Sequence, residues 1–222
     1  MNPPEITNLI QRAAALNTAA ISDALDSLGS PGGVPDIISR TPGTMCVGPA
    51  YTVQYKDLFL PGEPRGAANY IDGVPSGSVL VVSNSGRTDC TVWGNIMTEF
   101  AHERGLAGTI VDGAVRDVRR IGELGYPLFS RGIYMQSGKN RVALKATQVP
   151  LRISGVLINP GDVVAADDNG CVVIPFAIAG ETITRAEQIE RTERLILDAV
   201  AGGQTLESAR ARYRYDQPWL IK

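Results

Sequence analysis

The sequence predicts one α/β domain followed by a helical tail. Its first half alternates valine-rich apolar runs with helical patterns, which is typical of a parallel sheet whose strands are joined by helices. Its second half, from about residue 142, carries short apolar runs separated by Pro-Gly and Asp-Asn-Gly turns. With 222 residues and 44% hydrophobic side chains, the chain can fill one substantial core. We therefore expect the domain at residues 1–176 and the tail at residues 177–222.

A helix is expected first, over "AAISDALDSLG", where apolar residues recur at helical spacing. Asn17 or Thr18 can cap its N-terminus, and Gly29 offers a stop. After the loop "SPGGVPD", the segment "TMCVGPAYTVQY" predicts a pair of strands that is broken near Gly48 and Pro49.

Two apolar runs, "GSVLVVSN" and "AGTIVDG", predict buried strands on either side of a helix. Asp112 of "VDG" is expected to be a turn residue that ends the second strand. A further helix, "RDVRRIGELG", and a strand, "YPLFSRG", follow, so this region predicts a small parallel sheet. The first of these helices, "WGNIMTEFAHERG", is expected to collect Ile96, Met97, Phe100 and Ala101 on its apolar face.

The tail is expected to be helical as far as Gly202 and Gly203, and then to carry a shorter, arginine-rich helix. Its many charged residues indicate an exposed helix. We expect it to pack on the domain or on a neighbouring subunit.

Composition excludes several classes of function. The formal net charge of −2 gives no general attraction to nucleic acid or to anionic lipid, and no apolar run approaches the roughly 20 residues that span a bilayer. The three cysteines, at wide spacings, fit neither a disulfide framework nor a zinc site. The N-terminal segment lacks the pattern of a secretory signal. We expect a soluble, cytoplasmic protein with protein or small-molecule partners.

Two strand ends carry the residues of a candidate site. In an open α/β sheet, ligands bind beyond the carboxyl ends of the strands, where the following helices present free N–H groups. If the two ends converge, they combine backbone donors for a carboxylate, a guanidinium for a planar oxoacid and a carboxylate for a hard cation. These groups suit a 2-oxo acid bound with magnesium. The residues are Gly94, Asn95, Ile96 and Met97 beyond "GSVLVVSN", and Arg116 and Asp117 beyond "AGTIVDG".

A purely structural interpretation of the same residues is also open. Asp117 stands where a helix N-cap is expected, and Arg116 fits an ordinary surface ion pair. Gly94 equally fits a residue that opens a helix.

Several motifs together resemble a known family. They are "ISDALDSLG", "WGNIM", "RGLAGTIVDGAVRD", "YPLFSRG" and "INPGDVVAADDNGCVVIP", and the match as a whole extends roughly from Thr18 to Pro175. The combination is similar to the family that contains the regulator of ribonuclease activity A and the 4-hydroxy-4-methyl-2-oxoglutarate / 4-carboxy-4-hydroxy-2-oxoadipate aldolases. The "VDGAVRD" and "GDVVAADDNGCVVIP" blocks are specific when they occur together.

The resemblance implies a swivelling β/β/α domain, like the phosphohistidine domain, assembled as a trimer or a hexamer with its site between subunits. It implies that the amides of Gly94 to Met97 bind the pyruvyl group and that Arg116 holds its oxygens. It further implies that Asp117 carries Mg²⁺ or Mn²⁺. The aldolases commonly have an acidic residue at the position of Asn95, and many have a carboxylate near the positions of Arg119 and Arg120.

The function expected from these features is that of a metal-dependent lyase acting on 2-oxo acids. It would release pyruvate by retro-aldol cleavage of a 4-hydroxy-2-oxo acid, or by decarboxylation of oxaloacetate. In both reactions negative charge develops on an enolate oxygen, where a cation and an arginine stabilise it. The alternative is a non-catalytic protein-binding regulator that resembles the ribonuclease regulator.

Other polar residues favour structural roles. His102 is expected on the exposed face of its helix, and nothing marks Lys139 or Lys145 as a desolvated Schiff-base lysine. The stretch 167–170 lacks the spacing of a calcium loop and predicts a hairpin turn. A solvated helix face in the tail is expected to carry Glu187, Glu190 and Glu193.

Overall fold

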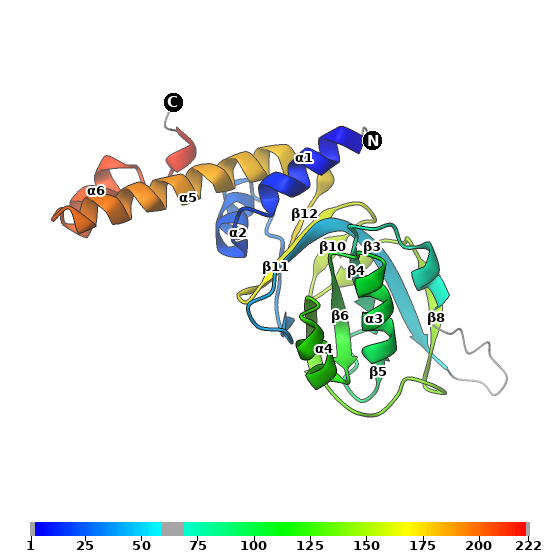
Figure 1. The fold of residues 1–222 in the computed structure, drawn as a ribbon. Helices are drawn as coiled ribbons and strands as arrows, with labels where there is room; N and C mark the ends of the chain where they lie inside the picture. The colour runs from blue at the N-terminus through cyan, green and yellow to red at the C-terminus, as the bar shows by residue number, and fades with distance from the viewer. Residues whose placement is uncertain (1–2, 59–68, 221–222) are drawn as a thin grey trace.

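A mixed, ten-stranded sheet forms the centre of the structure, which is a computed structural model that describes residues 3–58 and 69–220 (Figure 1). A separate two-stranded hairpin lies beside it. In chain order the strands are β1 (Gly33–Val34), β2 (Ile38–Ser39), β3 (Cys46–Asp57), β4 (Val79–Ser83), β5 (Thr91–Trp93), β6 (Gly108–Val115), β7 (Leu128–Ile133), β8 (Val142–Thr147), the hairpin strands β9 (Leu151–Ile153) and β10 (Val156–Ile158), β11 (Val163–Asp167) and β12 (Gly170–Ile174).

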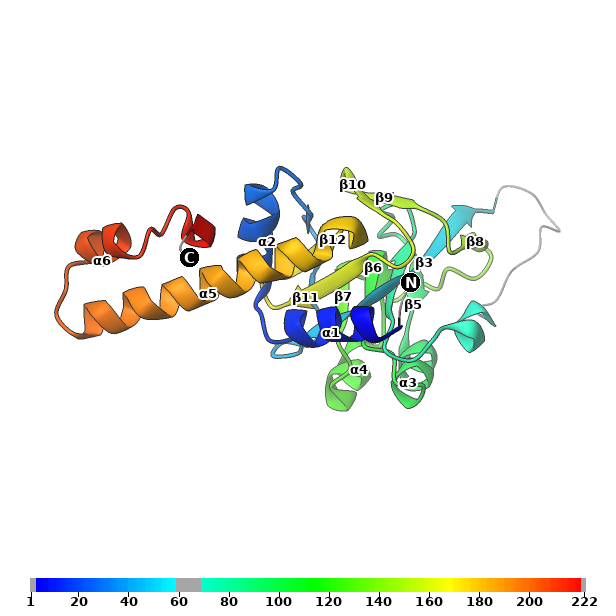
Figure 2. The same cartoon turned by 90° about the horizontal axis from the view of Figure 1, so that it is seen from above.

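The helices form two groups around this sheet, and α6 lies away from it (Figures 1 and 2). α3 and α4 cover one side of it, whereas α1, α2 and α5 lie together at the other end of the molecule, beside β11 and β12 (Figures 1 and 2). The α-helices are α1 (Pro3–Ala13), α2 (Thr18–Ser27), α3 (Asn95–Glu103), α4 (Val118–Leu124), α5 (Ala179–Ala201) and α6 (Leu206–Arg212), and 3₁₀ turns span Asn69–Gly73, Phe176–Ile178 and Pro218–Leu220.

The predicted parallel sheet is confirmed. Strands β3, β4, β6 and β7 are parallel neighbours in that order, and β11 and β12 form an antiparallel hairpin beside β3. The expected turn at 167–170 is this hairpin, in which Asp167 pairs with Gly170. The short strands β1, β2 and β5 were not predicted, because two or three residues show no periodicity.

The predicted break near Gly48 is wrong, because β3 is one continuous strand. It changes partners there instead: Pro49 pairs with Val163 of β11, and Ala50 begins the pairing with β4. Pro49 has no N–H group to donate, so it is tolerated where the ladder changes partner. Gly48 permits a close approach, because a Cβ atom there would lie 2.3 Å from the carbonyl oxygen of Gly77.

The prediction that Asp112 is a turn residue at the end of its strand is also wrong. β6 continues through it to Val115, and the residue is buried within the sheet. An Asp-Gly pair is a turn signal in an isolated sequence, but this carboxylate is satisfied by contacts from other strands.

Alternate residues along the strands fill separate cores. Leu80 and Val82 of β4 belong to the core beneath α3 and α4, whereas Val81 belongs to a second core with Ile153 and Val173. This second core contains residues of both halves of the chain. Strands buried on both faces read as continuous apolar runs, which is why they were recognised.

Helix α2 begins as predicted. The side chain of Asn17 caps it by accepting from the backbone N–H of Ala20, and the helix ends at Ser27, just before Gly29. Thr18 donates to the Asp167 carboxylate through both its backbone N–H and its hydroxyl, at 2.9 and 2.7 Å. These bonds attach α2 to the β11–β12 hairpin.

The tail has the predicted helices, but its glutamates are not simply solvated. α5 ends at Ala201 and α6 follows it, as expected from Gly202 and Gly203. Glu187 accepts from Arg12 of α1 at 2.7 Å, and Glu190 accepts from the backbone N–H of Asn17. α1 itself was not predicted. The far part of α5, with α6, extends away from the sheet as an arm (Figures 1 and 2).

Within residues 3–58 and 69–220, no helix is both long enough and apolar enough to span a membrane. Cys46, Cys90 and Cys171 are all buried and free.

Candidate active site between α3 and α4

The two predicted strand ends meet in one cleft. β5 leads into α3 and β6 leads into α4, and these two strands are parallel neighbours, so their carboxyl ends lie at the same edge of the sheet. α3 and α4 lie side by side in Figure 1. The cleft between them has a volume of about 960 Å³, and its lining contains all six predicted site residues, Gly94, Asn95, Ile96, Met97, Arg116 and Asp117, together with Val118, Arg119, Arg120, Glu123 and Lys139.

One part of the prediction needs correction: Gly94 follows β5, not the β4 strand "GSVLVVSN". β5 extends the sheet beyond the end of β4 and carries α3 to the edge where β6 ends. Trp93 at the end of β5 is buried and donates its indole N–H to the hydroxyl of Thr98, at 2.8 Å. This contact fixes the first turn of α3 relative to the strand.

A direct hydrogen bond joins the two halves of the cleft. The backbone N–H of Asn95 donates to Oδ2 of Asp117 at 3.0 Å. Gly94 makes this approach possible, because a Cβ atom there would lie 2.8 Å from the same oxygen and 3.2 Å from Nε of Arg116. A residue larger than glycine would push the Arg116–Asp117 pair away from α3.

The conformation of Asp117 argues against a simple helix cap. The residue does precede α4, but its side chain turns to α3 instead of capping its own helix. Its φ of +60° lies in the left-handed region, which residues other than glycine enter uncommonly. Backbone held in such a region tends to occur at functional sites. The geometry therefore favours the functional interpretation over the N-cap.

Arg116 is held by its backbone and leaves its guanidinium half-exposed in the cleft. Its backbone N–H donates to the carbonyl oxygen of Trp93 at 3.1 Å, and its Nε lies 3.6 Å from Oδ2 of Asp117. The side chains of Arg116 and Asp117 are 39% and 42% exposed. Both can therefore reach a ligand in the cleft.

The N-terminus of α3 faces the same space. The first amides of a helix have no partner within it, and they attract carboxylates together with the helix dipole. Asn95, Ile96 and Met97 supply these amides, and Gly94 precedes them. The expectation that Ile96 packs on the apolar face is wrong, because its side chain is 82% exposed.

Positive charge dominates the lining of the cleft. Arg119 and Arg120 lie on α4, where Arg119 contacts Glu123 at 3.3 Å and Arg120 contacts Glu99 at 3.2 Å. Lys139 comes from the segment between β7 and β8, so nothing in the local sequence marks it as a cleft residue. An anionic ligand fits these surroundings.

The remaining candidates lie elsewhere. His102 and Lys145 are both exposed and neither contributes to the cleft. Lys139 does line the cleft, but it is exposed and lacks the apolar surroundings that activate a Schiff-base lysine.

The cleft fits a divalent cation only as part of a complex with an anionic ligand. Within residues 3–58 and 69–220, no three His, Cys, Asp or Glu side chains gather closely enough to hold a metal ion. Asp117 presents a carboxylate of which Oδ2 takes one hydrogen bond from the protein. Mg²⁺ is usually held by one or two carboxylates, with water and ligand oxygens completing its shell. Asp117 meets that requirement.

Comparison with known proteins places the chain in a family. A family profile described as RraA-like (Aldolase/RraA) matches residues 18–173, which is more than half of the chain. The chain belongs to the Aldolase/RraA family. The matched range agrees with the resemblance from Thr18 to Pro175, and it includes every residue of the candidate site.

Curated proteins resemble the chain over most of its length. Protein DlpA of Legionella pneumophila is 50% identical over 96% of this chain, and the chain spans 35% of DlpA's length. A putative 4-hydroxy-4-methyl-2-oxoglutarate aldolase of Halalkalibacterium halodurans is 32% identical over 90% of this chain and 93% of its own.

Solved structures agree with the fold. An uncharacterized protein of Pseudomonas syringae pv. tomato has a TM-score of 0.85 and 53% identity, covering 92% of this chain and 97% of its own. Streptomyces coelicolor RraAS2, described as an unusual member of the RNase ES inhibitor RraA protein family, has a TM-score of 0.77 and 30% identity, covering 84% and 95%. The predicted α/β class with a C-terminal helix is confirmed, whereas the swivelling β/β/α arrangement stays a prediction.

Proposed function

We propose that this protein is a divalent-metal-dependent lyase that releases pyruvate from a 2-oxo acid. The observation that carries the proposal is the Asn95–Asp117 hydrogen bond, which brings a helix N-terminus, a guanidinium and a carboxylate into one cleft. Family relatives named as 4-hydroxy-4-methyl-2-oxoglutarate aldolases support lyase activity. Retro-aldol cleavage of a 4-hydroxy-2-oxo acid and decarboxylation of oxaloacetate are the two proposed reactions.

Each residue of the cleft has a proposed task. The amides of Ile96 and Met97 bind the carboxylate of the pyruvyl group, since they lie at the positive end of α3, whereas the Asn95 amide donates to Asp117. Arg116 donates to the oxygen on which enolate charge develops, in either reaction. Asp117 would hold the Mg²⁺ or Mn²⁺ ion. That cation supplies additional electrostatic stabilisation of the enolate when it is bound.

The charge of the lining indicates the substrate class. Arg119, Arg120 and Lys139 add three cationic groups to Arg116, against the carboxylates of Asp117 and Glu123. A substrate with a second carboxylate, beyond the one bound at α3, would be attracted to this positive surface. We therefore propose a 2-oxo diacid rather than a monoacid.

We further propose that the chain assembles with copies of itself, as a trimer or a hexamer. The arm of α5 and α6 exposes large apolar side chains that the domain leaves uncovered. Isolated exposed leucines are common, but several on one projecting arm favour an interface. They include Leu195, Leu197, Val200 and Leu206.

The same arm supports a second proposal, that of a protein-binding regulator. α6 and the residues after it carry Arg210, Arg212 and Arg214, which would suit an acidic protein surface. The relationship to RraAS2, described as belonging to a family of ribonuclease inhibitors, also supports it. This function would need no chemistry in the cleft.

An assay of pyruvate release distinguishes the two proposals. The protein is incubated with oxaloacetate and, separately, with a 4-hydroxy-2-oxo diacid, in Mg²⁺ and in EDTA. The lyase proposal predicts pyruvate release that exceeds the protein-free rate in Mg²⁺ and returns to it in EDTA. No release from either substrate, in Mg²⁺ or in Mn²⁺, would contradict it and favour the regulator.

A further inference from the structure

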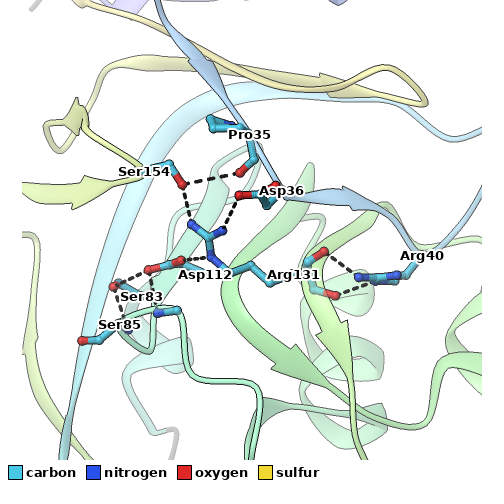
Figure 3. Close-up of polar contacts among 10 residues, drawn as sticks. Pro35, Asp36, Arg40, Ser83, Ser85, Asp112, Arg131 and Ser154 are labelled. Atoms are coloured by element: carbon cyan, nitrogen blue, oxygen red, sulfur yellow. Dashed lines mark hydrogen bonds and ion pairs between the residues drawn. The ribbon is translucent and has the colours of Figure 1, made fainter.

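A largely buried ion pair joins β6 to β7, and its carboxylate, Asp112, lies four residues before Arg116. Asp112 and Arg131 have side chains that are 6% and 16% exposed, and Nε of Arg131 donates to Oδ1 of Asp112. Figure 3 shows the guanidinium of Arg131 facing this carboxylate from β7. Neither residue lines the cleft between α3 and α4.

The pair sits at an irregularity of the sheet. Along β6 and β7, Val111 pairs with Ser130, but the next pair is Ala114 with Gly132. Two residues of β6, Asp112 and its neighbour Gly113, therefore stand opposite the single residue Arg131. This is a β-bulge, a feature that re-aims a strand and is often found next to active sites.

β6 also changes its other neighbour at the same point. It pairs with β4 as far as Asp112, opposite Ser83, and then with β5 from Ala114, opposite Thr91. Beyond the bulge, the part of β6 that leads to Arg116 stays paired with β7 and has β5 in place of β4 on its other side. Its direction depends on what holds Asp112 in place.

The other contacts of Asp112 and Arg131 come from the end of β4 and from loops around the bulge. Oδ2 of Asp112 accepts from the hydroxyl of Ser83 at 3.1 Å and from the backbone N–H of Gly86 at 3.2 Å. Arg131 also contacts Asp36 at 3.4 Å and donates to the hydroxyl of Ser154 (Figure 3).

Backbone conformation around the pair is unusual. Three residues that flank it, Asp36, Ser85 and Ser154, have φ values of +64°, +54° and +49°. Such conformations are costly for residues other than glycine and persist where the surroundings impose them. The loops between β1 and β2, after β4, and between β9 and β10 each contribute a residue that contacts the pair.

We propose that the Asp112–Arg131 pair is a positioning device for the candidate active site. It locks the bulge of β6 so that Arg116 and Asp117 leave the strand facing Gly94 and Asn95. Its consequence for catalysis rests on the proposed lyase function, whereas its consequence for geometry does not. Asp112 and Arg131 are positioning residues, and neither is proposed to touch substrate.

The Asn95 amide reports this geometry directly, because its N–H group donates to Asp117. Its hydrogen exchange is measured by NMR in the intact protein, in wild type and in Asp112→Asn. The proposal predicts that exchange at Asn95 accelerates by about tenfold or more, the effect expected for losing a hydrogen bond to a charged acceptor. Exchange at the amides of β4 should change far less.

A matched control separates positioning from general loss of stability. Asp162 is also buried, and its carboxylate accepts from the backbone N–H groups of Asn159 and Phe176, at the start of β11. Asp162→Asn removes a comparable charge without a contact to β6, and it should leave Asn95 exchange at the wild-type rate.

A second variant guards against failure of Asp112→Asn to fold. Asp112→Asn with Arg131→Gln removes both charges, so no unpaired charge is left buried. It should also accelerate exchange at Asn95. Wild-type exchange in both this variant and Asp112→Asn, or acceleration that Asp162→Asn reproduces, would overturn the proposal.

Turnover is measured on the same variants. If the lyase function is correct, Asp112→Asn should lower kcat for pyruvate release by about tenfold or more, as expected for small misplacements of catalytic groups. KM should change less, since the amides of α3 remain in place. The exchange measurement needs no substrate, so a wild-type protein without lyase activity would contradict the proposed function and not the positioning.

Discussion

Asn95 is the residue at which the cleft differs from what resemblance to the aldolases implies. Its backbone N–H is committed to Asp117, while its side chain supplies an amide where an acidic residue is common. Decarboxylation requires stabilisation of the enolate alone, because carbon dioxide leaves without proton removal from the substrate. Retro-aldol cleavage also requires a base for the 4-hydroxyl group, within about 3 Å or reached through one water.

We therefore predict that the protein decarboxylates oxaloacetate faster than it cleaves a 4-hydroxy-2-oxo diacid. Asn95→Asp should raise the aldolase-to-decarboxylase ratio, since a lost proton-transfer contribution typically slows a step by roughly 10²- to 10⁴-fold. Initial rates of pyruvate release on both substrates measure this ratio. An unchanged ratio in Asn95→Asp, or a wild-type protein that prefers the aldol substrate, would contradict the prediction.

At the residue scale, the sequence predicted which residues meet in the cleft, but it did not predict the Asp112–Arg131 pair or the position of Lys139. Gly94 to Met97 and Arg116–Asp117 were predicted from the rule that helix N-termini gather at strand ends, and the structure brings them together. Asp112 was misread because its partner Arg131 is distant in sequence. Lys139 reaches the cleft from the segment after β7, a placement that only tertiary structure reveals.

Among the elements, α2 depends on one carboxylate of the β11–β12 hairpin. Burial raises the pKa of Asp167, but hydrogen bonds from Thr18 and Asn169 outweigh it, so the pKa lies below its usual value. A lowered pKa in the folded state means that the ionised form stabilises the fold. This stabilisation is complete above the unfolded pKa of about 3.9 and is lost as the pH falls through the folded pKa.

Asp167→Asn is accordingly expected to lower the free energy of unfolding at pH 7 by about 1 kcal/mol, since an amide accepts these bonds less strongly than a carboxylate. The difference from wild type should shrink as the pH falls from about 4, where the unfolded chain takes up this proton, through the lower pKa of Asp167 in the folded protein. Urea unfolding at several pH values measures it. Asp198→Asn, an exposed change on α5, serves as the control. A difference that stays constant with pH would argue against this account.

The elements were predicted in proportion to their length and periodicity. The four parallel strands and α2 to α5 were found because each carries a sustained apolar pattern. β3 was divided wrongly, because Gly48 and Pro49 usually signal a break and here mark a change of partner strand. β5 is too short to be recognised, yet it places Gly94 at the site.

At the scale of the whole molecule, the proposal to test is that copies of the chain assemble through the arm of α5 and α6. We predict a trimer or a hexamer by light scattering at micromolar concentration. Leu197→Asp should weaken assembly by about tenfold or more, because burying one leucine is worth about 1.5–3 kcal/mol. Leu197 is 66% exposed on the arm, and Leu157, 46% exposed on β10, provides the matched change Leu157→Asp.

A monomeric wild-type protein would contradict the proposed assembly. If Leu197→Asp and Leu157→Asp weaken assembly equally, the result would contradict the proposal that the arm forms the interface. The cytoplasmic location expected from the sequence stays a prediction.

The central claim is that a divalent cation held at Asp117 supports pyruvate release. The most direct measurement is the rate of pyruvate release from oxaloacetate by wild type and by Asp117→Asn, each in Mg²⁺ and in EDTA, with circular dichroism and light scattering to verify the fold and assembly of the variant. We predict metal-stimulated release by wild type only, with the variant remaining at the EDTA rate in both conditions. Equal rates for wild type in Mg²⁺ and EDTA, or full metal stimulation of a folded Asp117→Asn variant, would contradict the claim.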